Sequence, residues 1–450
     1  MARNNLTDNF QYTLSSMTKP KENKPSLNQM ATDLSCMDDY DPNAMSVAQA
    51  RQFIQQFLMP VVETEKVATM QALGRVLATD IISPSNVPNH NNSAMDGFAF
   101  KFSANLKTLN IIGTAFAGKA FAGAVKAGEC VKIMTGAVIP MGADTVMMQE
   151  RIAVKSDRIT LLDEPKLGAN VRLAGEDLKI GHTVLAKGHV MKPADLGLVA
   201  SLGVGEISVF FPLKVAFFST GDELVSVGKK LEEGKIYDSN RYTLFGMLSR
   251  LGVVISDLGV VPDKPDLLEA TLLKAASEND VVITSGGVSV GEADFMKGLL
   301  TKHGQVLFWK INMKPGRPLA YGKVGLNENK QAHYFGLPGN PVSAMVTFYQ
   351  FVREALLTLQ GATPKPLPMF KVECVQTIKK AKGRTEFQRG ILFDENGTGS
   401  AVWKVKPLPN QGSGVLSSMS AANCFIVLDE TIGNCEAGAM VNVQLLEGII

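Results

Sequence analysis

The chain has 450 residues, of which 45% are hydrophobic and 20% are charged, a composition typical of a globular protein with sizeable cores. At roughly 150 residues per domain, this length allows about three domains. The formal net charge of +2 gives no bulk-charge argument for binding to nucleic acid or to a membrane.

The cysteines and the lengths of the apolar runs further limit the class of protein and its cellular compartment. Five cysteines are scattered without a C-x-x-C pair, which argues against a disulfide framework or a zinc site and predicts a reducing, cytoplasmic setting. No apolar run is long enough to span a bilayer, and residues 1–10 lack the apolar core of a secretory signal.

The first half of the chain is predicted to be mainly β. Residues 1–42 are polar and aperiodic, which predicts a disordered extension. A helix is predicted to begin after Ser46, which can cap it, and to end before Pro60. Residues 100–170 show short strand-like pieces punctuated by glycines, and residues 178–211 add a small helix and look like a return to the first segment.

From Pro212 onward strands alternate with helices, which predicts a parallel α/β sheet with right-handed crossovers. The predicted strands are 214–219, 253–261, 281–284, 306–311 and 333–337, and the predicted helices lie near 239–251, 265–278, 295–303 and 343–357. The pattern from 364 to 450 is β again, and its strand spacing favours a small barrel or sandwich.

The stretch 280–294 is the first candidate site. A β-branched run ends in Ser285-Gly286-Gly287, and Ser289, Glu292 and Asp294 follow. Glycines and hydroxyls after a buried strand are typical of a loop that approaches a phosphate, and nearby carboxylates can hold a hard metal ion. The alternative is an ordinary strand-to-helix turn with surface acids.

Other polar loops follow the neighbouring strands, and in an open parallel sheet these loops share the edge where ligands bind. Together they predict a site for a phosphorylated or oxyanionic substrate with Mg²⁺ held by carboxylates. Besides the loop above, the predicted members are Thr220, Gly221, Asp222, Glu223, Asp263, Lys310, Lys314, Arg317, Pro338, Gly339, Asn340, Pro341 and Ser343.

Several enzyme classes are excluded by missing motifs. No G-x-x-x-x-G-K-[ST] sequence is present, which excludes a P-loop NTPase, and no G-x-G-x-x-G stands in a dinucleotide-binding context. Two further clusters stay ambiguous. Asp96 fits an Asx turn before Gly97, and Arg172 with Glu176 and Asp177 could form an ion-pair knot or belong to a site.

The order of motifs resembles the molybdopterin molybdenumtransferase family, the MoeA and gephyrin E-domain enzymes, over residues 45–450. The matching stretches are 93–99, 134–137, 170–177, 219–224, 285–294, 314–316, 337–343 and 383–390. Two departures are Gly118-Lys119-Ala120 where the family often has Gly-x-Pro, and Arg317 where it often has lysine. These departures leave the preference between molybdate and tungstate open.

The resemblance implies a multidomain α/β plus β fold in an elongated homodimer. The α/β domain would resemble molybdopterin adenylyltransferase, beside a β-rich domain, a discontinuous elongated linker domain and a C-terminal β-barrel. The implied boundaries are 1–42 for the extension, 43–86 with 172–211 for the linker domain, 87–171 for the β-rich domain, 212–363 for the α/β domain and 364–450 for the barrel.

The implied reaction consumes adenylylated molybdopterin and molybdate, releases AMP with the help of Mg²⁺, and needs neither nucleic acid nor a membrane. Other proteins of cofactor biosynthesis and acceptor enzymes would be partners. By resemblance, Asp96 reaches the partner subunit's α/β domain, and further matched positions are Thr135, Asp177, Arg384 and Ser413. Ser343, Arg384 and Ser413 are candidates for a molybdate pocket. The alternatives are a non-catalytic molybdopterin-binding scaffold and a molybdopterin adenylyltransferase.

Overall fold

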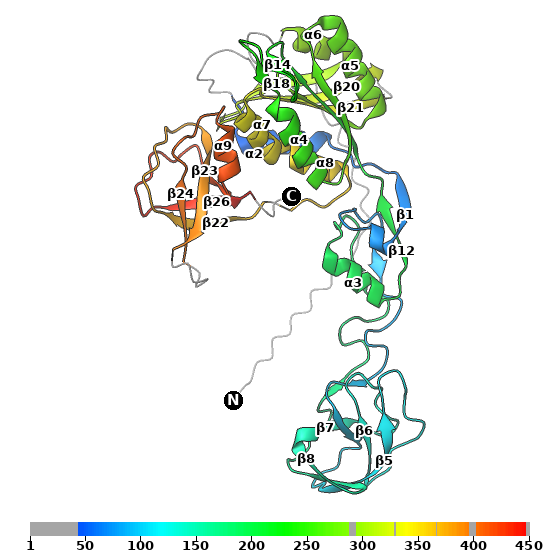
Figure 1. Ribbon diagram of the computed structural model, residues 1–450. Helices are drawn as coiled ribbons and strands as arrows, with labels where there is room; N and C mark the ends of the chain where they lie inside the picture. Colours follow the sequence, from blue (N-terminus) through cyan, green and yellow to red (C-terminus); the bar gives the residue numbers. More distant parts are fainter. Residues whose placement is uncertain (1–43, 288–293, 328–329, 366, 396–401, 447–450) are drawn as a thin grey trace, which may run out of the picture.

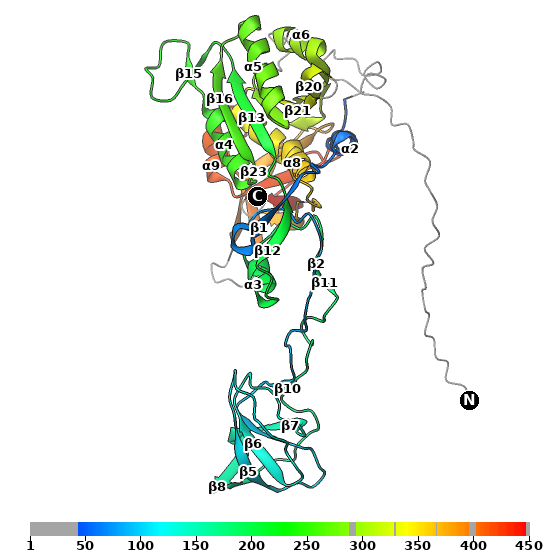
Figure 2. The same ribbon diagram turned by 90° about the vertical axis from the view of Figure 1, so that its right-hand side faces the viewer.

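A computed structural model describes residues 44–287, 294–327, 330–365, 367–395 and 402–446. The predicted disordered extension, residues 1–42, lies outside the described residues. The molecule is elongated, with a β-rich lobe at one end, a narrow connection, and an α/β domain packed beside a β-barrel at the other end (Figures 1 and 2).

The distal lobe is a β-sheet with the strand order β7-β4-β6-β5-β9-β8. Its faces are covered by two apolar clusters, one around Phe98 and Phe100 and one around Val131 and Ile133. Its elements are β4 (Gly97–Phe100), β5 (Thr108–Ala115), β6 (Glu129–Ile133), β7 (Thr145–Met148), the 3₁₀ turn η3 (Gln149–Arg151), β8 (Ile152–Lys155) and β9 (Arg158–Leu161).

The connection is built from chain segments that leave and return. Antiparallel pairs join β1 (Thr64–Ala68) to β12 (Glu206–Phe210), β2 (Ile81–Ile82) to β11 (Thr183–Leu185), and β3 (Asn92–Ser93) to β10 (Val171–Arg172). The 3₁₀ turn η2 (Thr69–Gln71) and α3 (Pro193–Ser201) complete it. The predicted return of residues 178–211 and its small helix are confirmed.

The ion-pair knot considered for this region is wrong. Arg172 lies in β10, and in the described part of the chain no ion pair joins it to Glu176 or Asp177. The Glu176 carboxylate instead accepts a hydrogen bond of 2.9 Å from the backbone N–H of Leu173. A local turn therefore uses this acid, and the strand pairing fixes the junction.

The α/β domain has a sheet with the order β16-β13-β17-β21-β20-β18. Its strands are β13 (Lys214–Thr220), β16 (Val254–Val261), β17 (Val281–Ser285), β18 (Gly304–Lys310), β20 (Pro318–Asn327) and β21 (Lys330–Leu337). The first four strands in that order are parallel, as predicted, but β20 is antiparallel to both of its neighbours. The five strands that the sequence predicts all run in the same direction, and the exception is β20, which the sequence did not predict. Because β18 reverses direction a second time, its carboxyl end stays at the same edge as that of β21.

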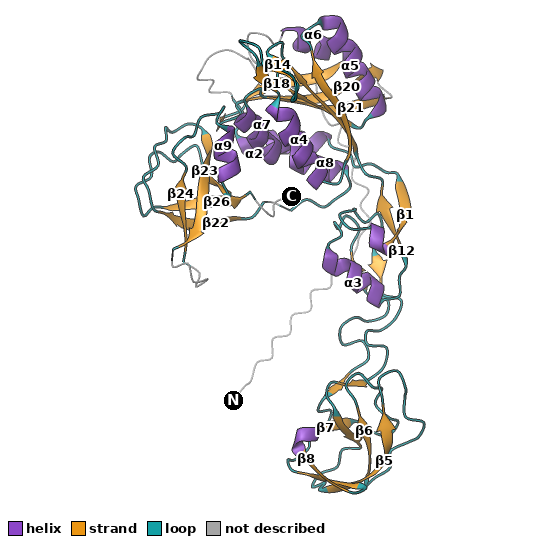
Figure 3. Cartoon of the chain, in the orientation of Figure 1, coloured by secondary structure: helices purple, strands orange, loops and turns teal. Residues whose placement is uncertain are grey.

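Helices cover both faces of this sheet (Figures 1 and 3). Alternate residues of β13 explain the two layers: Val215 and Phe217 face one apolar cluster, and Ala216 and Phe218 face the other. The first layer holds α2 (Val47–Phe57), α4 (Ser239–Arg250), α7 (Pro341–Thr347), the π-helical η4 (Phe348–Val352) and α8 (Arg353–Leu359). The second holds α5 (Pro265–Glu278) and α6 (Asp294–His303). Ser46 caps α2, as the sequence predicts, and Gln49 completes a capping box with it.

The C-terminal strands close into a barrel. The ring runs β23-β24-β22-β26-β25 and returns to β23 through a β23–β25 pairing. Its strands are β22 (Met369–Cys374), β23 (Thr385–Asp394), β24 (Trp403–Pro407), β25 (Cys424–Leu428) and β26 (Met440–Leu445). The short β19 (Met313–Lys314) pairs with β23 and so ties the α/β domain to the barrel, and α9 (Leu416–Ala421) packs against β23 and α7. Among the helices described, none is long and apolar enough to cross a bilayer.

Candidate functional site

A cavity of about 990 Å³ lies at the carboxyl edge of the α/β sheet. It brings together loops that follow β13, β16, β17 and β21, as the sheet-edge argument predicts. The predicted residues that line it are Thr220, Gly221, Asp222, Glu223, Asp263, Ser285, Gly286, Gly287, Pro338, Gly339, Asn340 and Pro341.

One wall of the cavity is acidic. The Thr220 hydroxyl donates a short hydrogen bond to Asp263, and the backbone N–H of Asp263 donates to Asp222 Oδ1 at 3.3 Å. The Glu223 carboxylate folds back over Gly221, where a Cβ atom would lie 2.7 Å from Glu223 Oε2. The loops after β13 and β16 therefore place three carboxylates on one side of the cavity.

The floor depends on glycine. Gly286 has a φ of +92°, and a Cβ atom there would lie 2.4 Å from the carbonyl oxygen of Thr220. Its N–H donates to the carbonyl oxygen of Leu337 at 3.1 Å. A side chain at this position would separate the strands' carboxyl ends, so the close backbone approach requires glycine.

The N-terminus of α4 supplies polar groups that the sequence did not assign to the site. Asp238 does cap α4, since its Oδ1 accepts from the N–H of Arg241 at 3.1 Å and from the Ser219 hydroxyl at 3.0 Å. Asp238 Oδ2 and Asn240 Oδ1 are buried and have no hydrogen-bond partner among the described residues. Both residues line the cavity and so offer acceptors to a bound molecule.

The barrel adds a further wall beside Ser413, the residue that the family resemblance placed in a molybdate pocket, and its lining residues Gly414 and Leu416 were not predicted. Gly414 and Leu416 line the cavity, and the carbonyl oxygen of Ser413 accepts from the N–H of Val342 at 3.1 Å. This contact joins the loop before α9 to the start of α7. The site is therefore assembled from two domains.

Some predicted residues lie near the cavity without lining it. Ser343 is buried as the third residue of α7, and Lys310 is the last residue of β18. The Lys314 ammonium lies 3.6 Å from the carboxylate of buried Glu386 on β23, and Arg384 immediately precedes that strand. These cations mark the junction between the α/β domain and the barrel. Ser289 and the side chain of Asp294 lie outside the described residues.

Asp96 and Thr135 lie in the distal lobe, away from the cavity of the same chain. Thr135 donates to Asp96 Oδ1 from its backbone N–H at 2.7 Å and from its hydroxyl at 2.8 Å. These bonds hold the pKa of Asp96 below its usual value. The carboxylate is thus bound by a distant loop and not by the Asx turn that spacing favoured. Asp177 is exposed in the connection, where its N–H donates to the carbonyl oxygen of Val87.

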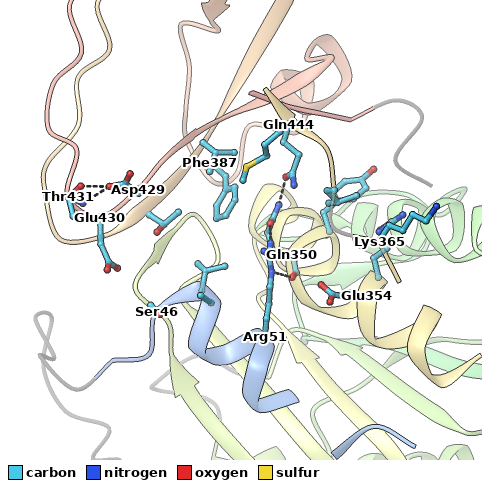
Figure 4. Close-up of a pocket in the computed structure, with 18 residues that line it drawn as sticks. Ser46, Arg51, Gln350, Glu354, Lys365, Phe387, Asp429, Glu430, Thr431 and Gln444 are labelled. Carbon is cyan, nitrogen blue, oxygen red and sulfur yellow. Dashed lines mark hydrogen bonds between the residues drawn. The ribbon is translucent and has the colours of Figure 1, made fainter. Parts of the chain in front are cut away.

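A separate cavity of about 600 Å³ lies between α2, the helix layer and the barrel (Figure 4). Arg51 Nε donates to the carbonyl oxygen of Gln350 at 2.8 Å, and Gln350 Nε2 donates to Gln444 Oε1 at 2.8 Å. This chain of contacts fixes the barrel against the α/β domain. None of the predicted site residues lines this second cavity.

The carboxylates of the cavity can be compared with what a bound Mg²⁺ requires. Within the described ranges, no group of three His, Cys, Asp or Glu side chains lies close enough to hold a metal ion. The predicted ligands Asp222, Glu223 and Asp263 therefore form no such group there, and the side chain of the fourth, Asp294, lies outside the described residues. Mg²⁺, however, commonly binds through one or two carboxylates together with water and substrate phosphates. The adjacent Asp222 and Asp263 match that smaller requirement.

Family comparisons agree with this architecture from one end to the other. The model described as "MoeA N-terminal region (domain I and II)" matches residues 45–203. The model described as "Probable molybdopterin binding domain" matches 216–358, and "MoeA C-terminal region (domain IV)" matches 371–446. The cavity belongs to the second and third matched regions. The chain belongs to the MoeA family of molybdopterin molybdenumtransferases.

Individual relatives cover nearly the whole chain. A molybdopterin molybdenumtransferase of Haemophilus influenzae is 45% identical over 406 residues, which are 89% of this chain and 98% of that protein. Gephyrin of Dictyostelium discoideum is 33% identical and shares 85% of this chain, but only 60% of its own length. The crystal structure of the moeA protein of Pyrococcus horikoshii superposes with a TM-score of 0.76 at 30% identity, covering 90% of this chain and all of that one.

Proposed function

We propose that the chain transfers molybdenum to molybdopterin: it takes adenylylated molybdopterin and molybdate, hydrolyses the adenylate, releases AMP and leaves molybdenum on the dithiolene sulfurs. The observation that carries the proposal is the cavity at the carboxyl edge, where a glycine floor, an acidic wall and buried acceptors meet. The 45% identity to a relative named for this activity supports the same assignment.

Each part of the cavity has a role in binding the adenylate. The glycines at 286, 287 and 339 allow phosphate oxygens to approach backbone N–H groups, and the hydroxyls of Thr220 and Ser285 add donors. The free acceptor atoms of Asp238 and Asn240 suit the N–H donors of a pterin ring. Asp222 and Asp263 would hold Mg²⁺, which when bound supplies charge neutralisation at the phosphate oxygens.

The junction with the barrel is the proposed place for molybdate. A tetrahedral oxyanion requires cations and hydroxyl donors, and Lys310, Lys314 and Arg384 gather at this junction near Ser343 and Ser413. We place the reaction in the cytoplasm, where cofactor biosynthesis proteins and acceptor enzymes would be partners.

Asp96 of the distal lobe becomes part of the site in a homodimer, in which the lobe of one subunit reaches the cavity of the other. Asp96 and Thr135 form an exposed, hydrogen-bonded pair in the distal lobe, away from the cavity of their own chain. Mixing an Asp96→Ala variant with an Asp263→Asn variant tests this arrangement. Random exchange of subunits should restore roughly a quarter of the wild-type activity, because half of the dimers then hold one intact site. If both acids act within one chain, the mixture stays inactive.

AMP release from adenylylated molybdopterin tests the function itself, with molybdate and tungstate compared side by side. The proposal expects release that depends on both Mg²⁺ and an oxyanion. Tight binding of the adenylate without AMP release would instead identify a scaffold. Consumption of ATP with molybdopterin in the absence of molybdate would identify an adenylyltransferase.

A further inference from the structure

Arg389 is a charged side chain in the interior of the barrel. It lies on β23 and is only 1% exposed. Its Nε donates to the Ser418 hydroxyl at 3.0 Å, and its Nη2 donates to the carbonyl oxygens of Gly412 at 3.0 Å and Asn410 at 3.3 Å. Within the described ranges, no carboxylate forms an ion pair with it.

A buried guanidinium with only neutral partners is an unusual choice for a barrel core. Burial disfavours its charge and lowers the pKa of Arg389 to about 10. Well-packed apolar side chains commonly replace buried charges without loss of stability. The bonds to carbonyl oxygens therefore suggest a role in fixing the conformation of the loop that carries them.

These carbonyl groups belong to the loop 410–416, which forms hydrogen bonds with residues of the barrel at several points. Besides the guanidinium contacts, the Gln411 side chain exchanges hydrogen bonds of 2.9 Å with both the N–H and the carbonyl oxygen of Arg389. The Ser418 hydroxyl that Arg389 contacts donates in turn to the carbonyl oxygen of Val415 at 2.6 Å. The loop is thus anchored along its length to one residue of β23.

The opposite side of this loop faces the cavity. Gly414 and Leu416 line it, and Ser413 binds Val342 beside the loop that follows β21. A shift of the loop would move the barrel-side wall relative to the loops that bind the adenylate. Binding groups must be held close to their productive positions by the residues behind them, so such a shift would weaken substrate binding even though the altered residue touches no substrate.

We propose that Arg389 is a positioning residue that holds the loop 410–416 as the barrel-side wall of the cavity and thereby sets the affinity for the oxyanion substrate. The inference rests on the proposed molybdenum transfer. It concerns a residue that acts through the loop and does not touch the substrate itself.

Kinetics of Arg389→Met and Arg389→Lys test the proposal, with Lys404→Met as the matched control. Lys404 is also a cation of the barrel, but it pairs with Glu373 and Glu395 on β22 and at the end of β23. Arg389→Met should raise the KM for molybdate by about tenfold or more with a much smaller change in kcat, and Arg389→Lys should recover part of the loss. An unchanged KM in a folded Arg389→Met variant, or an equal effect of Lys404→Met, overturns the proposal.

Hydrogen exchange gives a second readout that does not need activity. The N–H of Val342 is protected by the Ser413 carbonyl, so its exchange should accelerate in Arg389→Lys and stay unchanged in Lys404→Met. If Arg389→Met does not fold, Arg389→Lys and Ser418→Ala serve for both measurements. If exchange is faster in Arg389→Lys but the wild type releases no AMP, the proposed function is contradicted. The role of Arg389 in holding the loop is then still supported. Unchanged exchange contradicts that role itself.

Discussion

The side-chain amide of Asn240 donates at 2.7 Å to the carbonyl oxygen of Gly339, and at the same distance to the hydroxyl of Ser285. One residue at the start of α4 therefore joins the loops that follow β17 and β21. Because Asn240 is buried and its Oδ1 is left without a partner among the described residues, the same amide both fixes the floor of the cavity and presents an acceptor to it.

Asn240→Ala should weaken both the fold and substrate binding. Loss of two buried hydrogen bonds is expected to lower the free energy of unfolding by about 1–3 kcal/mol and to raise the KM for the adenylate. Asn279→Ala is the matched control, since Asn279 ends α5 and its Nδ2 donates to Ala275 at the opposite end of the sheet. Denaturant unfolding and steady-state kinetics of both variants separate the two effects. Equal KM values in the two variants would exclude a role of Asn240 in the site.

The sequence predicted most strands and helices of the α/β domain but missed β20. This strand contains Gly322 and Gly325, and glycine is disfavoured in strands, so the local pattern for a strand is weak. In the structure, a Cβ atom on Gly322 would lie 2.0 Å from the carbonyl oxygen of Gln305 on β18, so glycine permits the pairing. The pairing with β18 determines this strand, and a local sequence pattern contains no information about that pairing.

Gly286→Ala should be severely disruptive. The substitution places a methyl group against the Thr220 carbonyl in a backbone region that L-residues rarely adopt, and is expected to lower the free energy of unfolding by about 2–3 kcal/mol or more. Gly246→Ala in α4 is the control, because its Cβ atom meets no neighbour and should stabilise the helix by about 0.5–1 kcal/mol. Thermal unfolding of both variants measures the difference. A near-neutral Gly286→Ala would show that the floor tolerates a side chain.

Asp263→Asn should abolish most turnover while the protein stays folded. The amide keeps the size of the side chain and can still contact Thr220, but it lacks the charge that would hold Mg²⁺. We expect AMP release to fall by about 100-fold or more and the dependence on Mg²⁺ concentration to shift upward. Asp266→Asn, an exposed acid in the first turn of α5, should leave both quantities near wild type. Equal effects of the two substitutions would contradict a specific role of Asp263.

Acid should destabilise the α/β domain through His333. This residue is buried in the middle of β21 against Tyr321, and burial lowers its pKa from 6.5 to about 4. Since the unfolded chain binds the proton more readily, the stabilisation is complete above pH 6.5 and is lost as the pH falls toward 4, by up to about 3 kcal/mol. His333→Phe should remove this part of the pH dependence. If the free energy of unfolding falls by the same amount in both proteins between pH 6.5 and about 4, His333 does not contribute to the pH dependence.

In the same way, one part of the candidate site could be predicted from local sequence patterns, and another part depends on packing between distant segments. Glycine and carboxylate loops such as Ser285-Gly286-Gly287 and Asp222-Glu223 could be predicted because they follow buried strands, and the sheet edge collects them. Asn240 was not predicted as a site residue, since it lies inside the predicted helix near 239–251, and Leu416 lies in a separate β-rich region of the sequence. Their places in the cavity depend on packing between α4, α7 and the barrel, which no local pattern reports.

The most direct test of the proposed function is to count AMP and molybdenum together in one reaction. The purified protein is mixed with adenylylated molybdopterin, Mg²⁺ and molybdate, and released AMP is compared with the molybdenum bound to the pterin product. We expect equal amounts of the two, both lost in Asp263→Asn. Bound adenylate with no AMP, or AMP without molybdenum on the pterin, would contradict molybdenum transfer by this chain.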